Sequence, residues 1–240
     1  MSYTRVHVVI PAHDEQDLLG HCLDALDECK AVTPVPVTVT VVLDSCTDAS
    51  ARIAHGRARV LRLDARNVGM ARAAGFDSPG HARAGGTDNT DGTDGTDGAN
   101  GHWYATTDAD SRVPRTWLAD QLALAEAGAD VVAGLVEVDD WSDWSPATRQ
   151  RYLEGYRRGP GHRHVHGANI GVSARAYRRL GGFTPLAVHE DVQLVDRAER
   201  AGMSVAWSTA SPVLTSARRS ARVFGGFAGH LATTDQAVSQ

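Results

Sequence analysis

The stretch HWYATTDADS (residues 102–111) combines a short apolar and aromatic run with two aspartates, Asp108 and Asp110. A run of this length, followed at once by polar residues, is typical of a buried β-strand. Two carboxylates at one strand end repel each other, and each tends to raise the pKa of the other unless a positive charge lies between them. The pattern therefore predicts either a divalent cation at this strand end or a turn in which both acids are solvated.

Apolar runs of the same kind recur along the chain, at residues 6–10, 37–43, 58–63 and 129–138. Apolar side chains at helical spacing separate the first two runs, and residues 69–75 (GMARAAG) suit a short, tightly packed helix. Alternating strands and helices are typical of an open α/β sheet with right-handed crossovers. We therefore expect one α/β domain over residues 1–240, with a doubly wound, mostly parallel sheet flanked by helices.

The composition restricts the class of protein. The chain carries 24 Lys and Arg against 29 Asp and Glu, a formal net charge of −5, which argues against a general affinity for nucleic acid or for an anionic membrane. No apolar run approaches the ~20 residues that a membrane-spanning helix needs. The 3 cysteines form neither a complete disulfide framework nor a C-x-x-C zinc pattern. We expect a reduced, soluble, cytoplasmic protein, and the single lysine, Lys30, indicates a GC-rich bacterial genome.

Residues 85–101 (GGTDNTDGTDGTDGANG) repeat Thr-Asp-Gly and differ from the rest of the chain. Their aspartates recur every third residue, whereas calcium-binding loops place acids at every second residue. We expect a flexible linker, with a metal site as the alternative. Because the insert joins a helix to the following strand, it should leave the sheet at the amino ends of the strands, away from the side where ligands bind.

Three of the expected strands end in polar and acidic residues: PAHDE (residues 11–15), LDSCTDAS (residues 43–50) and TTDADS (residues 106–111). In a parallel sheet the carboxyl ends of the strands meet at one edge, and ligands of open α/β sheets bind outside that edge. One acidic turn carries little information. Three of them at the same edge predict a binding site there.

Six motifs, in order along residues 6–202 and apart from the insert, have counterparts in one known family. VVIPAHDE is similar to V-x-I-P-x-x-N-E, with Asp14 in place of Asn, and VVLDSCTDAS to V-V-D-D-G-S-T-D-x-T, with Leu43 in place of the first acid. NVGMARAAG is similar to N-x-G-x-x-x-A-R-N-x-G but two residues shorter, and TTDADS contains the D-x-D signature. GANIGVSARAYRRLGGF matches G-x-N…G-G-F, and HEDVQLVDRAERAG resembles E-D-x-x-L-x-x-R-x-x-x-x-G. The chain thus resembles family 2 glycosyltransferases, which have the GT-A fold and bind nucleotide-sugars.

The resemblance divides the expected domain into a nucleotide-sugar-binding half, about residues 1–111, and an acceptor-binding and catalytic half, about residues 112–240. It assigns Asp44 to the edge of the base and Arg72 to the base or the diphosphate, with a solvated helix arginine as the alternative for Arg72. Asn169 is expected to contact the donor sugar. The full set that the resemblance assigns to the nucleotide is Pro11, Ala12, Glu15, Asp44, Arg72 and Asp108.

For the metal, the resemblance implies Mn²⁺ or Mg²⁺ bound by Asp110, with Asp108 contacting the ribose or, through water, the metal. Such hard cations prefer oxygen ligands, and a cation on the diphosphate acts as a Lewis acid when the sugar–phosphate bond breaks. A late histidine is a further metal ligand in several relatives, and His230 is the one histidine after the E-D segment. A surface histidine is the alternative there.

For catalysis, the resemblance implies inversion of the anomeric centre by direct displacement, with Asp191 as the general base and Glu190 orienting the acceptor or the sugar. The alternative is that both acids only favour the N-terminus of an amphipathic helix. The basic segment SARRSAR (residues 216–222) offers Arg218, Arg219 and Arg222 for bidentate hydrogen bonds to the diphosphate, or else forms a solvated basic face.

Two further groups have more than one interpretation. His162, His164 and His166 alternate, so that an extended strand would put all three on one face, either to bind zinc or to line an acceptor cleft. Aromatic residues of the segment 139–166 either stack on an acceptor or pack as core. They are Trp141, Trp144 and Tyr152.

Together these expectations describe a soluble, non-processive, metal-dependent inverting glycosyltransferase of the hexosyltransferase type, which moves a sugar from a UDP- or GDP-sugar to a hydroxyl of an unidentified acceptor. The chain lacks the Q-x-x-R-W motif of processive members. The alternatives are a catalytically silent nucleotide-sugar or carbohydrate-binding module and a sugar-phosphate nucleotidyltransferase, although PAHDE is not the G-x-G-T-R loop that the latter needs. The donor base, the acceptor and the formation of a homodimer stay open.

Overall fold

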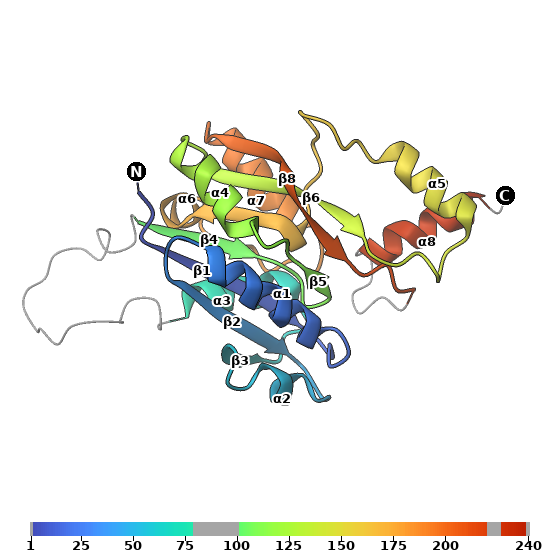
Figure 1. Ribbon diagram of the computed structural model, residues 1–240, viewed down its shortest axis with the longest axis horizontal. Coiled ribbons are helices and arrows are strands. Elements are labelled where there is room, and N and C mark those ends of the chain that lie inside the picture. Colours follow the sequence, from blue (N-terminus) through green and yellow to red (C-terminus); the bar gives the residue numbers. More distant parts are fainter. Residues whose placement is uncertain (1, 79–100, 220–226, 239–240) are drawn as a thin grey trace, which may run out of the picture.

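The computed structural model describes residues 2–78, 101–219 and 227–238, and Figure 1 shows its ribbon. Most of the Thr-Asp-Gly insert, expected to be a flexible linker, lies outside the described residues. The described chain forms a mixed α/β structure around one 8-stranded sheet, in the order β3-β2-β1-β4-β7-β6-β8-β5. The α/β fold that the strand and helix patterns predict is confirmed.

The N-terminal half is a parallel βα arrangement. β1, β2 and β3 pair in parallel, and β4 pairs in parallel with the other side of β1. The bounds are β1 Arg5–Ala12, α1 Leu19–Val32, β2 Val37–Asp44, α2 Ser50–Ala54, β3 Arg59–Leu63, α3 Val68–Asp77 and β4 His102–Thr106. The order of the strands reverses between β1 and β4, and ligands of open α/β sheets bind at the carboxyl ends of the strands beside such a reversal.

The C-terminal half mixes strand directions. β7 is antiparallel to both β4 and β6, β8 is parallel to β6, and the short β5 is antiparallel to β8. The strands are β5 Ser111–Arg112, β6 Val131–Val138, β7 Ile170–Ser173 and β8 Val205–Thr215. The helices are α4 Trp117–Glu126, α5 Pro146–Gly155, the 3-10 turn η3 Gly167–Asn169, α6 Ala174–Arg179, α7 Glu190–Arg200 and α8 Phe227–Val238.

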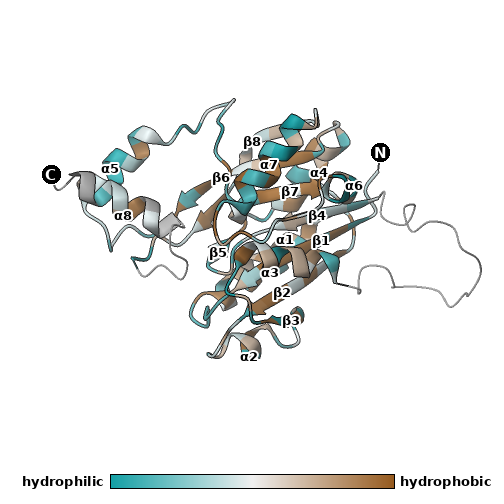
Figure 2. Ribbon diagram, turned by 180° about the vertical axis from the view of Figure 1, so that it is seen from behind, coloured by the Kyte–Doolittle hydropathy of each residue, from teal (hydrophilic) through white to brown (hydrophobic). Residues whose placement is uncertain are grey.

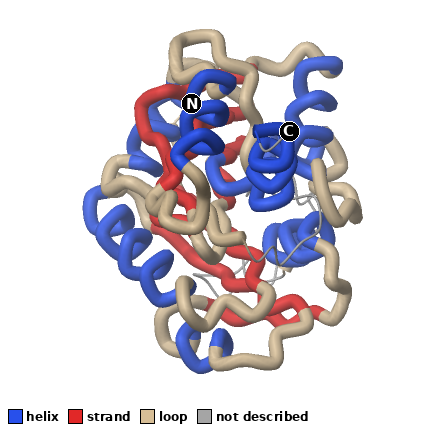
Figure 3. The backbone as a smooth tube through the Cα atoms, turned by 90° about the vertical axis from the view of Figure 1, so that its right-hand side faces the viewer, coloured by secondary structure: helices blue, strands red, loops and turns tan. Residues whose placement is uncertain are grey.

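Helices cover both faces of the twisted sheet (Figure 3), and each face has its own core. One core joins the sheet to α1 and α4, whose side chains Leu19, Leu23, Trp117 and Leu118 are buried. The other core joins the sheet to α3, α6 and α7, which lie in front in Figure 2. The strands between them are buried on both sides, as apolar runs without alternation predict.

Helices α5 and α8 lie side by side at one end of the molecule (Figure 1). Thr148 of α5 donates a hydrogen bond to Asp235 of α8, and Arg219 donates another to Asp235. The chain therefore returns from β8 to a small helical pair beside the sheet. In the described part of the chain, no helix is long and apolar enough to cross a membrane.

Candidate active site

The loops at the carboxyl edge of the sheet hold residues in a rare backbone conformation. Among the described residues other than glycine, those with positive φ are Asp14, Ser45, Arg66 and His189. The first three follow β1, β2 and β3, and His189 directly precedes α7. Residues with side chains seldom adopt this conformation, and those that do concentrate at functional sites where the surroundings hold them in place. Strain is therefore concentrated around the edge where the sequence predicts a site.

Asp44, which the resemblance assigns to the edge of the base, binds backbone N–H groups of a neighbouring loop. Its carboxylate accepts hydrogen bonds from the N–H groups of Ala65, Arg66 and Asn67, at 2.7–2.9 Å, and one from the Ser45 hydroxyl. Burial alone would raise the pKa of Asp44, but these hydrogen bonds outweigh it and hold the pKa below its ordinary value. The carboxylate is 4 % exposed and fixes the turn between β3 and α3. Contact with a base stays a prediction.

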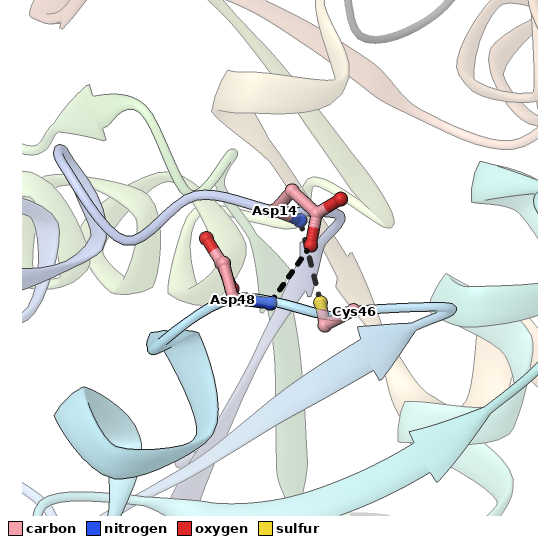
Figure 4. A group of neighbouring side chains, drawn as sticks. All are labelled: Asp14, Cys46 and Asp48. Carbon is pink, nitrogen blue, oxygen red and sulfur yellow. Dashed lines mark hydrogen bonds between the residues drawn. The ribbon is translucent and has the colours of Figure 1, made fainter.

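The loops after β1 and β2 are bonded to each other. Asp14 accepts hydrogen bonds from the N–H groups of Thr47 and Asp48, and Asp48 accepts one from the N–H group of Gln16. The Asp14 N–H group points to the sulfur of Cys46 at 3.4 Å (Figure 4). Asp14, where the resembling motif has Asn, therefore works as an acceptor that ties two loops together.

Asp14, Cys46 and Asp48 are also the group of described residues whose atoms lie close enough together, within 4.8 Å, to hold a metal ion. Both carboxylates already accept backbone hydrogen bonds there, Asp48 from Gln16 and from Ser50. The trio is thus an acidic cluster whose carboxylates hold backbone N–H groups, and it does not include the pair Asp108 and Asp110 that the sequence singles out.

Asp108 is bound by a buried arginine. Arg72 of α3, which is 2 % exposed, lies 2.5 Å from Asp108 through one nitrogen and forms an ion pair with Glu190 through another. Its Nε donates a third hydrogen bond to the hydroxyl of Thr106, at 3.2 Å. Glu190 is 3 % exposed, so the buried charges of Arg72 and Glu190 compensate each other. This group joins the end of β4 to the start of α7.

Asp110 has an arginine of its own. Arg218, which follows β8, lies 3.3 Å from the Asp110 carboxylate and binds Glu15 through both terminal nitrogens. Glu15, expected in the nucleotide site, is 6 % exposed, and its backbone N–H group donates to Ser50 at 2.9 Å. Arg218 therefore joins the loop after β1 to the loop after β4, and its expected contact with a diphosphate stays a prediction.

The electrostatics of the aspartate pair match the repulsion that the sequence predicts. Burial raises the pKa of Asp108, with Asp191 adding to the rise and Arg72 opposing it. Burial and then the charge of Asp108 raise the pKa of Asp110 to about 7, although Arg218 lowers it. Burial is the larger cause for both aspartates, and the two arginines offset it only in part.

Helix α7 begins at the predicted catalytic pair. Glu190 points into the ion pair with Arg72, whereas Asp191 is half-buried and accepts a hydrogen bond from the N–H group of Val192. Further along α7, Arg197 donates to the carbonyl groups of Leu180 and Gly182, at 2.5 and 2.6 Å. The G-G-F and E-D motifs are thus bonded to each other. Glu190, the neighbour of Asp191, shares Arg72 with Asp108, and the charge of Asp191 adds to the raised pKa of Asp108.

A cavity of about 350 Å³ opens beside Asp110 and Arg218. Arg112 and Asp139, which form an ion pair, also line it. Pro11 and Ala12 end β1 at the same edge. The predicted residues that the structure gathers around this edge are Pro11, Ala12, Glu15, Asp44, Arg72, Asp108, Asp110, Glu190, Asp191 and Arg218.

Other predicted residues lie elsewhere or outside the description. Asn169 is 2 % exposed. Its side-chain amide donates hydrogen bonds to the carbonyl groups of Leu135 and Ser211 and accepts one from the indole N–H group of Trp117, in the core. Arg219 stacks on Trp144 at 4.5 Å and bonds Asp143. Arg222 and the side chain of His230 lie outside what the structure describes. The sugar, diphosphate and metal roles of these residues stay predictions.

The three alternating histidines form a stack. The ring centres of His162 and His164 lie 5.9 Å apart, and those of His164 and His166 lie 6.0 Å apart, with the rings nearly parallel. Tyr156 stacks on His164 at 4.1 Å. His162 bonds the carbonyl of Ser208, and His164 accepts from the N–H group of Arg157. The rings share a face, as the alternation predicts, and they pack on each other there.

Of the predicted aromatic residues, Trp144 is 7 % and Tyr152 6 % exposed, and both belong to the core. Trp141 is half-buried and packs against Tyr152, with ring centres 5.4 Å apart. An acceptor contact stays a prediction for this residue.

Three positions that shape the surroundings of Arg72 and α3 were not singled out in the sequence analysis. Thr106 accepts the third Arg72 hydrogen bond, and a Cβ atom at Gly167 would lie 2.2 Å from the Arg72 guanidinium. A Cβ atom at Gly69 would lie 2.1 Å from the carbonyl oxygen of Thr184. The glycines stand in the quoted N-x-G and G-x-N motifs, so a requirement for close approach was open to inference. Nothing in the sequence marks Thr106.

No protein-family model and no curated protein matches the chain. Solved structures do. TarS from S. aureus, in its complex with UDP-GlcNAc, superposes with a TM-score of 0.61 over 91 % of this chain and 60 % of that one, at 12 % identity. The mannosyltransferase PcManGT from Pyrobaculum calidifontis, in complex with GDP-Man and Mn²⁺, has a TM-score of 0.63 over 91 % and 59 %, at 18 % identity.

The chain therefore spans about 60 % of the length of these two chains, and 37 % of the longer TarS structure, which it matches with a TM-score of 0.62. At such low identities the likeness concerns the fold alone. The chain has the mixed α/β fold, with its curled 8-stranded sheet and flanking helices, that these nucleotide-sugar-binding structures share.

Proposed function

We propose that this chain is a family 2 type, inverting glycosyltransferase that transfers a sugar from a UDP- or GDP-sugar to an acceptor hydroxyl with the help of a divalent cation. The observation that carries the proposal is the grouping of Asp108, Asp110 and Asp191 at the carboxyl edge of the sheet. The likeness in fold to a mannosyltransferase in complex with GDP-Man and Mn²⁺, and to TarS in complex with UDP-GlcNAc, supports it.

Asp108 and Asp110 fit a divalent cation. They supply hard oxygen donors, and Asp110 borders a cavity. Burial, and for Asp110 also the charge of Asp108, raises their pKa values, which a bound cation would lower again. Asp110 would bind the metal, with Asp108 beside it. Bound there, the cation would stabilise the negative charge that develops on the diphosphate. Arg218 already lies 3.3 Å from Asp110 and would contribute a second positive charge near the same phosphates.

Asp191 is the acid available for proton transfer. Glu190 is buried in its ion pair with Arg72, whereas Asp191 is half-buried at the first turn of α7. In the proposed reaction Asp191 takes the proton of the acceptor hydroxyl, the acceptor oxygen forms a bond to the anomeric carbon, and the nucleoside diphosphate leaves with the bonding electrons. Attack opposite to the leaving group inverts the anomeric centre.

Calorimetry with UDP and with GDP, in the presence and absence of Mn²⁺, tests the binding part of this proposal. Hydrolysis of UDP-GlcNAc and GDP-Man tests the chemical part, because water can replace the acceptor. Binding of neither nucleotide under any condition would refute the proposed donor class. Tight binding without any hydrolysis or transfer over a panel of sugar acceptors would favour the catalytically silent binding module instead.

A further inference from the structure

The surroundings of Arg72 leave little room for a nucleotide. Its three hydrogen-bonding nitrogens are directed to Thr106, Asp108 and Glu190. The guanidinium lies 5.8 Å from the ring centre of Phe183, and a Cβ atom at Gly167 would already collide with it. A side chain that is 2 % exposed and bound through each of its three nitrogens is placed to organise its neighbours.

Arg72 belongs to a helix that is itself anchored to the segment leading into α7. At the start of α3, the side chain of Asn67 donates to the carbonyl of Pro185 at 3.1 Å, and the N–H group of Gly69 donates to that of Leu186 at 3.0 Å. The absence of a side chain at Gly69 is what permits this contact, because a Cβ atom would meet Thr184 and Leu186. Helix α3 therefore fixes residues 184–186, and Arg72 fixes Glu190 a few residues later.

Between these two anchors the chain passes through a conformation it would not hold unaided. His189 has φ +64°, in the left-handed region that disfavours residues with a side chain. Such a residue persists only when its surroundings determine it. The His189 carbonyl accepts a hydrogen bond from the N–H group of Gln193, and the next residue, Glu190, is held by the ion pair with Arg72. Release of that contact would let the first turn of α7, with Asp191, relax away from its present position.

We propose that Arg72 is a positioning residue for catalysis, which holds Glu190 so that Asp191 faces the site, and that it does not bind the nucleotide. This inference rests on the proposed function only in taking Asp191 as the base. It differs from the nucleotide role that the resemblance assigns to Arg72. An arginine that turned to a diphosphate would leave the buried carboxylate of Glu190 without its partner, which is strongly unfavourable.

The test compares Arg72→Lys with the control Arg175→Lys, an exposed arginine of α6. Lysine keeps the charge but cannot bind Glu190 and Asp108 with the same fork of nitrogens. We expect kcat for hydrolysis of the accepted nucleotide-sugar to fall by roughly 10²-fold, the loss that about 1 Å of misplacement can cause. The dissociation constants of UDP and GDP should change by less than about threefold, because the variant removes no contact to the nucleotide.

Amide hydrogen exchange gives a second readout that does not depend on activity. In Arg72→Lys, the N–H groups of residues 190–193 should exchange faster, while the rest of α7 and the melting temperature change little. The control variant should leave all three measurements unchanged. A loss of nucleotide affinity as large as the loss of kcat, with unchanged exchange in residues 190–193, would overturn the proposal in favour of direct nucleotide contact.

Arg72→Gln provides a further arm, since it leaves Glu190 unpaired and can fail to fold. The double variant Arg72→Gln, Glu190→Gln removes both buried charges, and we expect it to fold and to be no slower than Arg72→Gln alone. Losses in kcat that simply multiply in the double variant would show that the two residues act independently. Failure of the unchanged protein to bind UDP or GDP would refute the proposed function, whereas the exchange measurement would still decide whether Arg72 orders α7.

Discussion

The guanidinium of Arg218 lies 3.3 Å from the carboxylate of Asp110, so the segment after β8 supplies a positive charge to the loop after β4. The same arginine binds Glu15, just as Arg72 binds both Asp108 and Glu190. Each aspartate of the D-x-D pair therefore shares an arginine with a buried glutamate. The arrangement keeps two repelling carboxylates in one site and still leaves the pKa of Asp110 raised.

This relationship predicts how the metal should contribute. In Asp110→Asn, Arg218 keeps Glu15 as a partner, so the fold should survive, while the loss of one anionic ligand should weaken Mn²⁺-dependent binding of UDP or GDP by at least roughly tenfold. Calorimetry with and without Mn²⁺ measures the difference. A chelator should lower the affinity of the unchanged protein to the level of the variant. Equal affinity for the nucleotide in all of these conditions would remove Asp110 from the metal site.

The lowered pKa of Asp44 leads us to predict that the stability of the protein depends on pH. Its pKa is lowered in the folded protein, so the stability that its ionised form contributes is present above the ordinary pKa of 3.8 and is lost as the pH falls through the folded value. Asp44→Asn should lower the free energy of unfolding by about 2 kcal/mol at neutral pH, because it removes charge-assisted hydrogen bonds to three backbone N–H groups.

Urea titrations at neutral pH and near pH 3 check this prediction. The gap between the unchanged protein and Asp44→Asn should narrow at the lower pH, because the stability that the ionised carboxylate contributes begins to be lost once the pH falls below the ordinary pKa of 3.8. A gap that is the same at both pH values would mean that the charge of Asp44 does not hold the turn of residues 64–67.

The close packing around Gly69 leads us to predict that no larger residue fits between α3 and the segment before α7 without a loss of stability. In Gly69→Ala, the new methyl group would lie 2.1 Å from the carbonyl oxygen of Thr184, and backbone must move to admit it. We expect a loss of about 1–3 kcal/mol in stability, as for other insertions into packed contacts, together with reduced turnover. Gly20→Ala in α1 is the matched control, since a Cβ atom there meets nothing within 4 Å. Thermal melting of the two variants would contradict the constraint if they behaved alike.

The sequence predicts those elements of the fold that are marked by a local pattern of apolar residues. The runs that form β1, β2, β4 and β6 are apolar and rich in β-branched residues, and Leu19, Cys22, Leu23 and Leu26 mark one face of α1. Strand β8 is not apparent, because its first residues are exposed or half-buried and it contains Pro212. The two-residue β5 exists through its pairing with β8 and has no signal of its own.

The candidate site divides in the same way. The acidic residues at the ends of β1, β2 and β4 are visible because parallel strands bring their carboxyl ends together. The partner of each acidic residue cannot be recognised in the sequence, because ion pairs such as Arg72 with Glu190 and Arg218 with Glu15 join segments far apart in the chain. Asn169 illustrates the limit of a motif: its amide is occupied by Leu135, Ser211 and Trp117, which no spacing in the sequence reveals.

The assignment of Asp191 as the base gives the sharpest prediction. A group that removes the acceptor proton acts in the transition state and contributes little to holding the donor. Asp191→Asn keeps the shape of the side chain but cannot take a proton, so transfer or hydrolysis should fall by roughly 10²- to 10⁴-fold while affinity for UDP or GDP changes little. Asp110→Asn should instead weaken nucleotide binding together with rate, so the two variants separate the base from the metal ligand.

Asp196→Asn is the matched control, because Asp196 lies on the same helix with a side chain 48 % exposed and only a 3.8 Å contact to Arg200. It should react and bind like the unchanged protein. Steady-state rates and calorimetry on the three variants provide the comparison. If Asp191→Asn turned over at the rate of Asp196→Asn, the base would have to be sought elsewhere. Glu190 would be a poor substitute, because its carboxylate is buried in the ion pair with Arg72.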